Sequence, residues 1–573
     1  MSIVSISDGV GSNISGDDLQ GLAAQLHVTL PDSQDAQDYL TILRSFEAIM
    51  SHIESATDYT PSDLQPKVLT TPRSYWQPKL EDNPFNAWSH RCHIKSTSPA
   101  SNLLMGRTVA IKDNISVGGL PTTMGIPRSL FPNGEGSPIS SIDATVVSRI
   151  LEAGGVINGT STCESFCASP LSFTSATGPV HNPLLHNYTA GGSSSGSAVL
   201  VAAHVLSSTK KGTWGHTVEL AIGSDQAGSV RIPASYNGIY GLKPTFGLIP
   251  YTGAASMSPM IDHLGPLGAG LEDIAALLEV MAGYDGYDQR MTPESPLRSQ
   301  VKPYLSMLLE LRQQILSTST PGQSLRVGLL KESFSLPGVS EAVRDTIYHA
   351  AKTFFEATGA SVVEIHIPMH LEGPIIWTAA TRPSMSSHLC QGNPSGHLSY
   401  LPPHARIQWP LSQEAFDTLT SNNPAVVNIM FSEIFAKNLS KPGLEAKTHR
   451  KAFELRAAYD RALEEVDVLI TPCAPTVAMP HPNQDIVGGG KPSILDRLGV
   501  AVGVTSNTCP FNVTGHPGLS VPCGFATDAR RPDIPLPVGM QIVGRRWADE
   551  QVIMAAAIFE RGRQLVRGEG GSA

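Results

Sequence analysis

The sequence has few cysteines and no long apolar run, and both shortages limit the kinds of protein that it can encode. Its 573 residues include only seven cysteines, an odd number that contains no CxxC pair. This spacing indicates neither a disulfide framework nor a zinc ribbon, and it is typical of a reducing compartment. No stretch approaches the roughly 20 uninterrupted apolar residues of a membrane span, and the N-terminus lacks the basic start and apolar centre of a secretory signal. We therefore expect a cytoplasmic protein that contacts no membrane.

Positively charged residues are also in the minority: 40 lysines and arginines against 50 aspartates and glutamates give a formal net charge of −10. A chain of this charge offers no reason to expect nucleic acid as a partner. With 41% hydrophobic and 16% charged residues, it can bury a large core, and a small neutral molecule is the expected ligand. His90, Cys92 and His93 carry side chains that bind metals, but a site would need further ligands that the pattern does not indicate. We expect no metal.

The first hundred residues are predicted to form helices and a linker. A helix is expected at 17–28 and a second at 33–56, where apolar side chains recur every three or four positions. This apolar face needs a surface to cover it, either the main body or a second copy of the chain, so a homodimer through these helices is a hypothesis. Residues 58–100 contain many prolines and predict an irregular linker. We therefore divide the chain into an N-terminal helical domain with its linker, 1–95, and a main domain, 96–573.

The main domain alternates strands and helices, which is typical of an α/β fold. β-branched and apolar residues predict strands at 108–111 and 156–157. Between them, residues 141–153 predict a helix that ends at a pair of glycines. A further buried strand is expected at 218–222.

A glycine- and serine-rich stretch at 189–231 is the most unusual part of the sequence. It opens with GGSSSGS at 191–197 and closes with SDQAGS at 224–229. The first cluster alone would suit a flexible linker, but the apolar run 198–203 follows it and predicts a buried helix instead. Acyl transfer requires free hydroxyls and backbone N–H groups close to the substrate. Glycines let the main chain approach a ligand in this way.

Charged residues follow two of the predicted strands. Lys112 comes directly after 108–111, and lysine is seldom fully buried unless it is paired. Burial among hydroxyls would favour the neutral amine and provide a base, whereas a lysine at a strand end can also extend to water. Spacing alone favours the exposed lysine. Asp225 and Arg231 flank the second cluster, and an ion pair between them would fix its loop.

Three motifs occur together in this chain: VAIKDN with Lys112, GGSSSGSA with Ser193, and GSDQAGSVRIPA with Ser229. On these motifs the sequence resembles the amidase signature family, from about Leu104 to Arg561. The helical N-terminal segment makes it most similar to bacterial amidases that act on aliphatic and aromatic amides. The resemblance implies an α/β fold with a large mixed, mostly parallel twisted sheet covered by helices, preceded by a small α-helical domain.

The resemblance also implies a catalytic triad. Ser229 would be the nucleophile, Ser193 a bridging serine that follows a cis peptide bond from Gly192, and Lys112 the base. A serine hydroxyl is too weak an acid to attack an amide without a base that takes its proton. A neutral lysine can do so, with the second serine relaying the proton in place of a histidine.

Further residues take supporting roles by the same resemblance. Four consecutive backbone N–H groups would form the oxyanion hole: Gln226, Ala227, Gly228 and Ser229. Each such donor stabilises the transition state by roughly 3 kcal/mol. Ser194 would support the triad, and Asp225 with Arg231 would brace the loop. No cofactor is implied, and the expected partner is a small-molecule amide.

The implied reaction is hydrolysis of a small aliphatic or aromatic carboxylic amide to the acid and ammonia or an amine, through an acyl-enzyme on serine. A second hypothesis is the glutaminase subunit of a tRNA-dependent amidotransferase, which shares the motifs but works with partner subunits. A third is a catalytically impaired protein that kept the fold.

Two departures from the family pattern bear on activity. Ser195 replaces a glycine of GGSSGGS and adds a Cβ where the turn would favour a positive φ. Residues 204–216 are an insertion, which costs little if it leads into solvent, as Lys210–Gly212 suggest. The insertion would displace the triad if it interrupted the helix that follows Ser193.

Overall fold

The chain divides into two units after Asp63: unit 1 is Met1–Asp63 and unit 2 is Leu64–Ala573. The computed structural model describes residues 12–67, 70–131, 136–137, 139–210, 212–396, 407–482 and 492–568. The division falls earlier than the expected one at residue 95. Residues 64–95 belong to unit 2 because they add two strands to its sheet.

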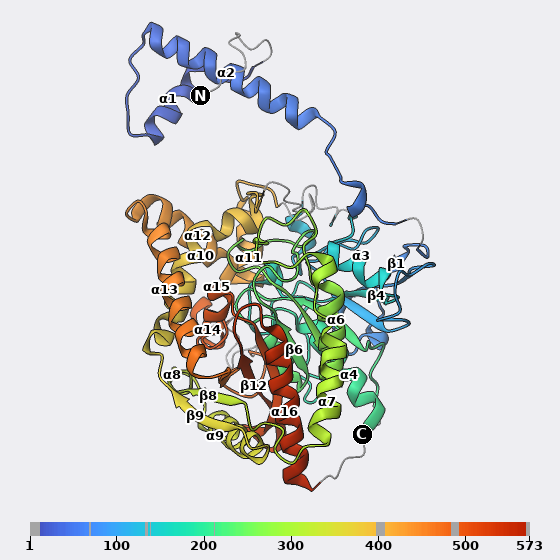
Figure 1. Cartoon of the computed structure of the whole chain (residues 1–573). Coiled ribbons are helices and arrows are strands. Elements are labelled where there is room, and N and C mark those ends of the chain that lie inside the picture. Colours follow the sequence, from blue (N-terminus) through green and yellow to red (C-terminus); the bar gives the residue numbers. More distant parts are fainter. Residues whose placement is uncertain are drawn as a thin grey trace. The chain divides into compact units, whose positions relative to one another are not determined.

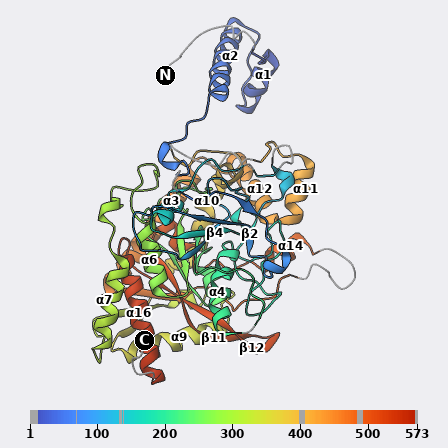
Figure 2. The same ribbon diagram turned by 90° about the vertical axis from the view of Figure 1, so that its right-hand side faces the viewer.

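Unit 1 has two helices among its described residues, α1 (Gly16–Gln25) and α2 (Gln34–Ser55), drawn in blue in Figures 1 and 2. Each begins at a serine N-cap, because the hydroxyls of Ser15 and Ser33 accept hydrogen bonds from N–H groups of the first turn. The expected apolar face of α2 is present, and these side chains on it are exposed: Tyr39, Ile42, Phe46, Met50 and Ile53.

A mixed sheet of twelve strands forms the main layer of the described part of unit 2. Its strands are β1 (Tyr75–Trp76), β2 (Trp88–Lys95), β3 (Thr108–Lys112), β4 (Val156–Ser161), β5 (Leu220–Ser224), β6 (Tyr240–Lys243), β7 (Leu264–Gly268), β8 (Arg326–Leu330), β9 (Ser361–Ile365), β10 (Val468–Pro472), β11 (Gly518–Asp528) and β12 (Arg531–Val543). Their order is β1-β2-β4-β3-β5-β7-β6-β11-β12-β10-β8-β9. The groups β4-β3-β5 and β10-β8-β9 are parallel, and the other neighbours are antiparallel. The expected mixed α/β fold is confirmed. The expectation of a mostly parallel sheet is wrong, because seven of the eleven neighbouring pairs among the described strands are antiparallel.

Helices pack against this sheet and against one another. They are α3 (Thr145–Glu152), α4 (Ser195–Thr209), α5 (Arg231–Asn237), α6 (Leu271–Met281), α7 (Tyr304–Leu316), α8 (Lys331–Phe334), α9 (Glu341–Ala350), α10 (Gly373–Cys390), α11 (Gln413–Asn422), α12 (Pro424–Leu439), α13 (Leu444–Glu465), α14 (Ile494–Gly499), α15 (Pro510–Thr514) and α16 (Asp549–Arg567). The C-terminal helix α16 runs beside α7, and α10 packs on α12 and α13 (Figures 1 and 2). Within the described residues, no helix is both long and apolar enough to cross a membrane.

The expected irregular linker at 58–100 is wrong for its second half. There, β2 pairs with β4, and its side chains at Trp88, His90, Cys92 and Ile94 are buried. The strand was missed because His90 and Arg91 interrupt the alternation of apolar side chains, so the sequence WSHRCHIK shows only a weak period-two pattern.

Parallel pairing brings the ends of three strands to one edge of the sheet. β3 lies between β4 and β5, and Ile111 of β3 is opposite Ile222 of β5. Lys112, the last residue of β3, therefore lies beside the end of β5 at Ser224. The carboxyl ends of parallel strands are the usual place for ligands in α/β proteins.

Candidate active site

Lys112 is fully buried at the end of β3, where its amine lies among serine oxygens. Its Nζ is 2.8 Å from Ser193 Oγ and 2.8 Å from Ser224 Oγ. The same nitrogen is 3.3 Å from the carbonyl oxygen of Ser224. The interpretation of Lys112 as an exposed residue at a strand end is therefore wrong. The amine is placed to exchange a proton with Ser193.

The turn before α4 carries Ser193 to the lysine. The peptide bond between Gly192 and Ser193 is cis, as the family resemblance implied. A Cβ at Gly192 would lie 2.6 Å from the carbonyl oxygen of Ser169, so only glycine fits there. The N–H of Ser194 donates to the carbonyl oxygen of Ser229 at 3.2 Å. This bond joins the turn that carries Ser193 to the loop that carries Ser229.

Ser224 is a polar centre of the site that sequence reasoning missed. Its hydroxyl contacts Lys112 and also accepts a hydrogen bond from Asn114 Nδ2 at 3.1 Å. Its carbonyl oxygen accepts a hydrogen bond from the hydroxyl of Ser194 at 3.2 Å. The signal was a serine at the end of a buried strand, immediately before the DQAGS motif.

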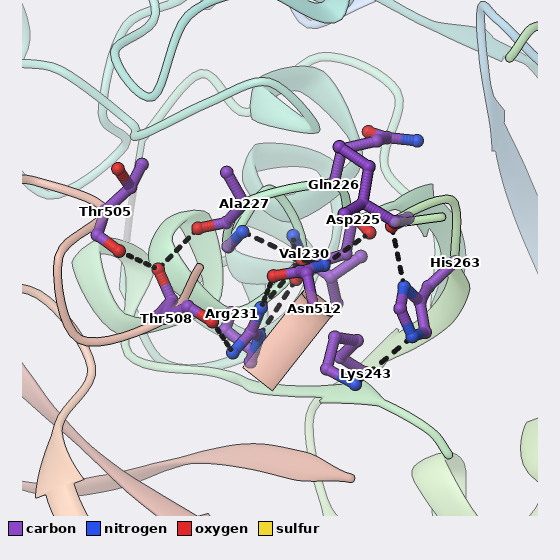
Figure 3. Close-up of polar contacts among 12 residues, drawn as sticks. Asp225, Gln226, Ala227, Val230, Arg231, Lys243, His263, Thr505, Thr508 and Asn512 are labelled. Atoms are coloured by element: carbon purple, nitrogen blue, oxygen red, sulfur yellow. Dashed lines mark hydrogen bonds and ion pairs between the residues drawn. The ribbon is translucent and has the colours of Figure 1, made fainter. Parts of the chain in front are cut away.

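A buried ion pair holds the loop that carries Ser229 (Figure 3). Arg231 Nη2 is 2.8 Å from Asp225 Oδ1, and Arg231 Nε is 3.0 Å from Asp225 Oδ2. Neither side chain is exposed. Arg231 also donates to Asn512 Oδ1, Gln541 Oε1 and the carbonyl oxygen of Thr508, at 2.8, 2.7 and 3.0 Å. The expected pairing is confirmed, and the pair connects the loop to the C-terminal part of the chain.

The same environment sets the charge of Asp225. Burial by itself would raise its pKa, but the Arg231 guanidinium and the hydrogen bonds from Arg231 and Asn512 hold the pKa well below its ordinary value. The Asn512 amide nitrogen is 2.9 Å from Asp225 Oδ1. Asp225 is therefore ionised throughout the pH range in which proteins normally fold.

The loop from Gln226 to Ser229 differs from the expected oxyanion hole at one position. The N–H of Gly228 donates to Asp225 Oδ1 at 2.8 Å, so it does not point to a substrate oxygen. The expectation for Gly228 is wrong because the buried carboxylate already takes this donor. The N–H groups of Gln226, Ala227 and Ser229 donate to no other group in the described part of the chain. Their role as oxyanion donors stays a prediction.

A second buried lysine, Lys243 at the end of β6, belongs to the same network (Figure 3). Its Nζ donates to the carbonyl oxygen of Pro244 at 3.0 Å and lies 3.4 Å from Nε2 of His263. Burial lowers the pKa of Lys243 well below its ordinary value, and the charge of Arg231 adds to this effect. His263 supports the loop, because its carbonyl oxygen accepts the N–H of Asp225 at 2.8 Å.

Ser195 causes no strain in the turn. It is the first residue of α4 and has a helical backbone, so its Cβ meets no disfavoured φ. Its hydroxyl donates to Glu164 Oε1 at 3.0 Å. Glu164 Oε2 accepts the N–H and the hydroxyl of Thr174, both at 2.7 Å. Burial raises the pKa of Glu164 to about 7, although these hydrogen bonds and the nearby Lys112 oppose the rise.

The insertion at 204–216 does not interrupt the helix after Ser193. α4 is continuous to Thr209, and the side chains from 204 to 210 are partly or fully exposed. Lys211 lies outside the described residues. The indole N–H of Trp88 donates to the carbonyl oxygen of His216 at 2.8 Å. The insertion thus lengthens the far end of the helix, and its last residue contacts β2.

These observations define a class of protein: a mixed α/β fold with a buried lysine in contact with one serine, beside a glycine-rich loop that carries another. The model of the Amidase family matches residues 89–553. The chain belongs to the amidase family, and it is an amide-hydrolysing enzyme.

Two sequence relatives show how far the similarity extends. An enantioselective amidase of Rhodococcus rhodochrous is 33% identical over 518 residues, which cover 89% of this chain and 90% of the relative. A glutamyl-tRNA(Gln) amidotransferase subunit from Methanosarcina mazei is 32% identical over 471 residues, 80% of this chain and 84% of the relative.

Solved structures share the fold. The peptide amidase of Stenotrophomonas maltophilia aligns over 80% of this chain and 83% of its own, with a TM-score of 0.57 and 27% identity. A 6-aminohexanoate cyclic dimer hydrolase aligns over 80% of this chain and 85% of its own, with a TM-score of 0.62 and 23% identity. The latter likeness concerns the fold alone.

Arg231→Met tests the buried ion pair. Removing the guanidinium leaves the Asp225 carboxylate buried without its cation, so we expect the free energy of unfolding to fall by about 3–5 kcal/mol. Urea denaturation followed by fluorescence measures the change. Arg344→Met, which removes an exposed surface partner of Glu341 and Asp345, is the control and should leave the midpoint unchanged. Equal midpoints for Arg231→Met and the wild type would contradict the assigned role.

Glu164→Gln tests the raised pKa of the buried carboxyl. Folding raises this pKa from 4.5 to about 7, so between these values the folded state keeps a proton that the unfolded chain has lost. The stability that this proton confers is complete below pH 4.5 and is lost as the pH rises to 7. The glutamine of the variant does not ionise, so its free energy of unfolding does not fall in this way. The difference in free energy of unfolding, variant minus wild type, should therefore increase by about 3 kcal/mol between pH 4.5 and 8. Thermal unfolding of both proteins across this range measures the difference, and a constant difference refutes the prediction.

Proposed function

We propose that the protein is a cofactor-independent amidase that hydrolyses small aliphatic or aromatic carboxylic amides through an acyl-enzyme on Ser229. The observation that carries this proposal is the distance of 2.8 Å between Nζ of the fully buried Lys112 and Oγ of Ser193. The bond between Ser194 and Ser229 supports it, since it connects the two serine loops. From these two contacts we infer that the base, the relay and the nucleophile lie close together.

The proposed mechanism begins with proton transfer. Neutral Lys112 accepts a proton from Ser193 while Ser193 accepts the proton of Ser229, whose oxygen attacks the amide carbon. The N–H groups of Gln226, Ala227 and Ser229 stabilise the resulting oxyanion. The proton returns through Ser193 to the leaving nitrogen, and ammonia or an amine departs. Water then attacks the acyl-enzyme by the same route and releases the carboxylic acid.

The glutaminase subunit of an amidotransferase is the second candidate, and the similarity to the Methanosarcina protein favours it. The stand-alone activity has more support, because the enantioselective amidase matches 89% of this chain whereas the Methanosarcina protein matches 80%. Intact contacts of Lys112, together with the continuous helix α4, speak against a catalytically impaired protein. All seven cysteines are unpaired and buried, which supports a cytoplasmic location.

Ammonia release by the purified chain separates these candidates. We expect the chain alone to release ammonia from propionamide or benzamide. Ser229→Ala and Lys112→Met should each lower kcat/KM by at least about 10³-fold, because nucleophile and base act as one unit. Lys447→Met, which removes an exposed lysine of α13, is the matched control and should retain activity. Activity that appears only after addition of amidotransferase partner subunits would favour the second candidate.

A fluorophosphonate probe tests the nucleophile independently of the substrate. Intact mass spectrometry should show one adduct on the wild type, none on Ser229→Ala and slow labelling of Lys112→Met. An adduct that persists in Ser229→Ala would refute the assignment of the nucleophile.

We also propose a homodimer through the apolar face of α2, whose exposed side chains are a poor surface for a monomer. Light scattering should give twice the mass of one chain, and Phe46→Glu combined with Met50→Glu should halve this mass. Gln37→Glu on the opposite side of α2 is the control. A monomeric wild type would refute the dimer.

A further inference from the structure

Each of three consecutive carbonyl oxygens in the loop before Ser229 accepts a hydrogen bond from a distant side chain. Asn512 Nδ2 donates to the carbonyl of Asp225 at 2.9 Å, and the hydroxyl of Thr508 donates to that of Ala227 at 2.5 Å. Both donors follow β10 in the sequence, and Figure 3 shows them beside the loop. The third donor comes from elsewhere. The indole Nε1 of Trp377, in α10, donates to the carbonyl of Gln226 at 2.9 Å.

These bonds set the direction of the N–H groups. In a planar trans peptide, the C=O of one residue and the N–H of the next point in opposite directions. A donor that holds the Gln226 carbonyl therefore holds the Ala227 N–H on the other side of the peptide plane. Thr508 likewise holds the Ala227 carbonyl. The N–H of Gly228, on the other side of that peptide, donates to Asp225.

The Trp377 contact differs from the other two in its surroundings. Asn512 and Thr508 are almost fully buried, whereas Trp377 is half-buried. The peptide that it holds reverses by rotation about ψ of Gln226 and φ of Ala227, and the indole bond to the Gln226 carbonyl opposes this rotation. No other donor to the Gln226 carbonyl exists in the described part of the chain.

Trp377 also packs against an apolar cluster of unit 2. The cluster includes Phe166, Cys167 and Met257. Phe166 and Cys167 lie in the segment after β4, next to Glu164, which in turn contacts the first residue of α4. One side chain thus joins the loop that carries Ser229 to an apolar cluster whose members include residues of the segment after β4.

We propose that Trp377 is a positioning residue of the oxyanion hole, whose indole N–H keeps the Ala227 N–H directed at the carbonyl oxygen of the substrate. This inference rests on the proposed acyl transfer by Ser229. The bond acts on the transition state more than on bound substrate, because the negative charge on the substrate oxygen develops only during attack.

Trp377→Phe is the variant that tests the bond, since it keeps an aromatic ring in the apolar cluster while it removes the donor together with part of the ring volume. We expect kcat for benzamide to fall about 10- to 100-fold with KM changed less than about threefold. Trp547→Phe is the matched control. It removes another indole donor, one that binds Glu294 Oε2 at 3.0 Å and makes no bond to the loop of Ser229 within the described residues. The control should keep both constants.

Benzaldehyde provides the second readout. It forms a hemiacetal with a reactive serine and places an oxygen in the oxyanion hole, so Trp377→Phe should weaken its inhibition by the same factor as kcat. Inhibition by benzyl alcohol, which forms no oxyanion, should be unchanged. A loss confined to KM, or equal weakening of both inhibitors, would show that Trp377 only shapes the pocket and would overturn the proposal.

Fluorophosphonate labelling distinguishes failure of this inference from failure of the proposed function. Labelling of Ser229 in both the wild type and Trp377→Phe, with unchanged kcat in the variant, overturns the role of Trp377 alone. Absence of labelling in the wild type overturns the nucleophile, and the inference with it.

Discussion

The buried contact between Asp225 and Arg231 is the interaction on which the rest of the site depends. A carboxylate and a guanidinium without solvent exposure are stable only if their remaining hydrogen-bonding groups are satisfied. Here Arg231 is satisfied by Thr508, Gln541 and Asn512 from the C-terminal part of the chain. The loop that carries Ser229 is therefore held by residues that lie 277 to 310 positions after Arg231 in the sequence. The fold must be complete before this loop has one conformation.

The side chains of the proposed triad are arranged by two further constraints. Parallel pairing of β3 with β5 brings Lys112 and Ser224 to the same edge of the sheet, and the glycine turn before α4 brings Ser193 to the lysine. Glu164 and Ser195 then connect the start of α4 to the segment after β4. The polar groups of the site are thus fixed from several elements at once, and a side chain at Gly192 would collide with the neighbouring backbone. Because these side chains are already held in position, the proposed reaction does not require a mobile loop to become ordered first.

Much of the fold could be predicted from sequence, because its signals are local. The strand β3 and the helices α3 and α4 follow local apolar patterns, and the structure places them near their expected positions. β2 could not be predicted, since its buried histidine and arginine become acceptable only after β4 and the neighbouring aromatic side chains surround them. The sequence also could not show whether the insertion at 204–216 displaces the triad, because the answer depends on whether the end of α4 lies in solvent. The raised pKa of Glu164 was equally invisible, because it depends on burial by segments distant in the sequence.

The sequence by itself determined which chemical groups are present. Lys112, Ser193 and Ser229 occur in motifs whose residue types suit acyl transfer, and glycine positions showed where the main chain must approach closely. Only the tertiary structure decided how these groups are used. It buried Lys112 instead of exposing it, assigned the Gly228 N–H to Asp225, and brought Trp377 and Thr508 to the carbonyls of the loop. The physical reason is that burial and hydrogen-bond direction depend on which distant segments meet, and local sequence patterns do not contain that information.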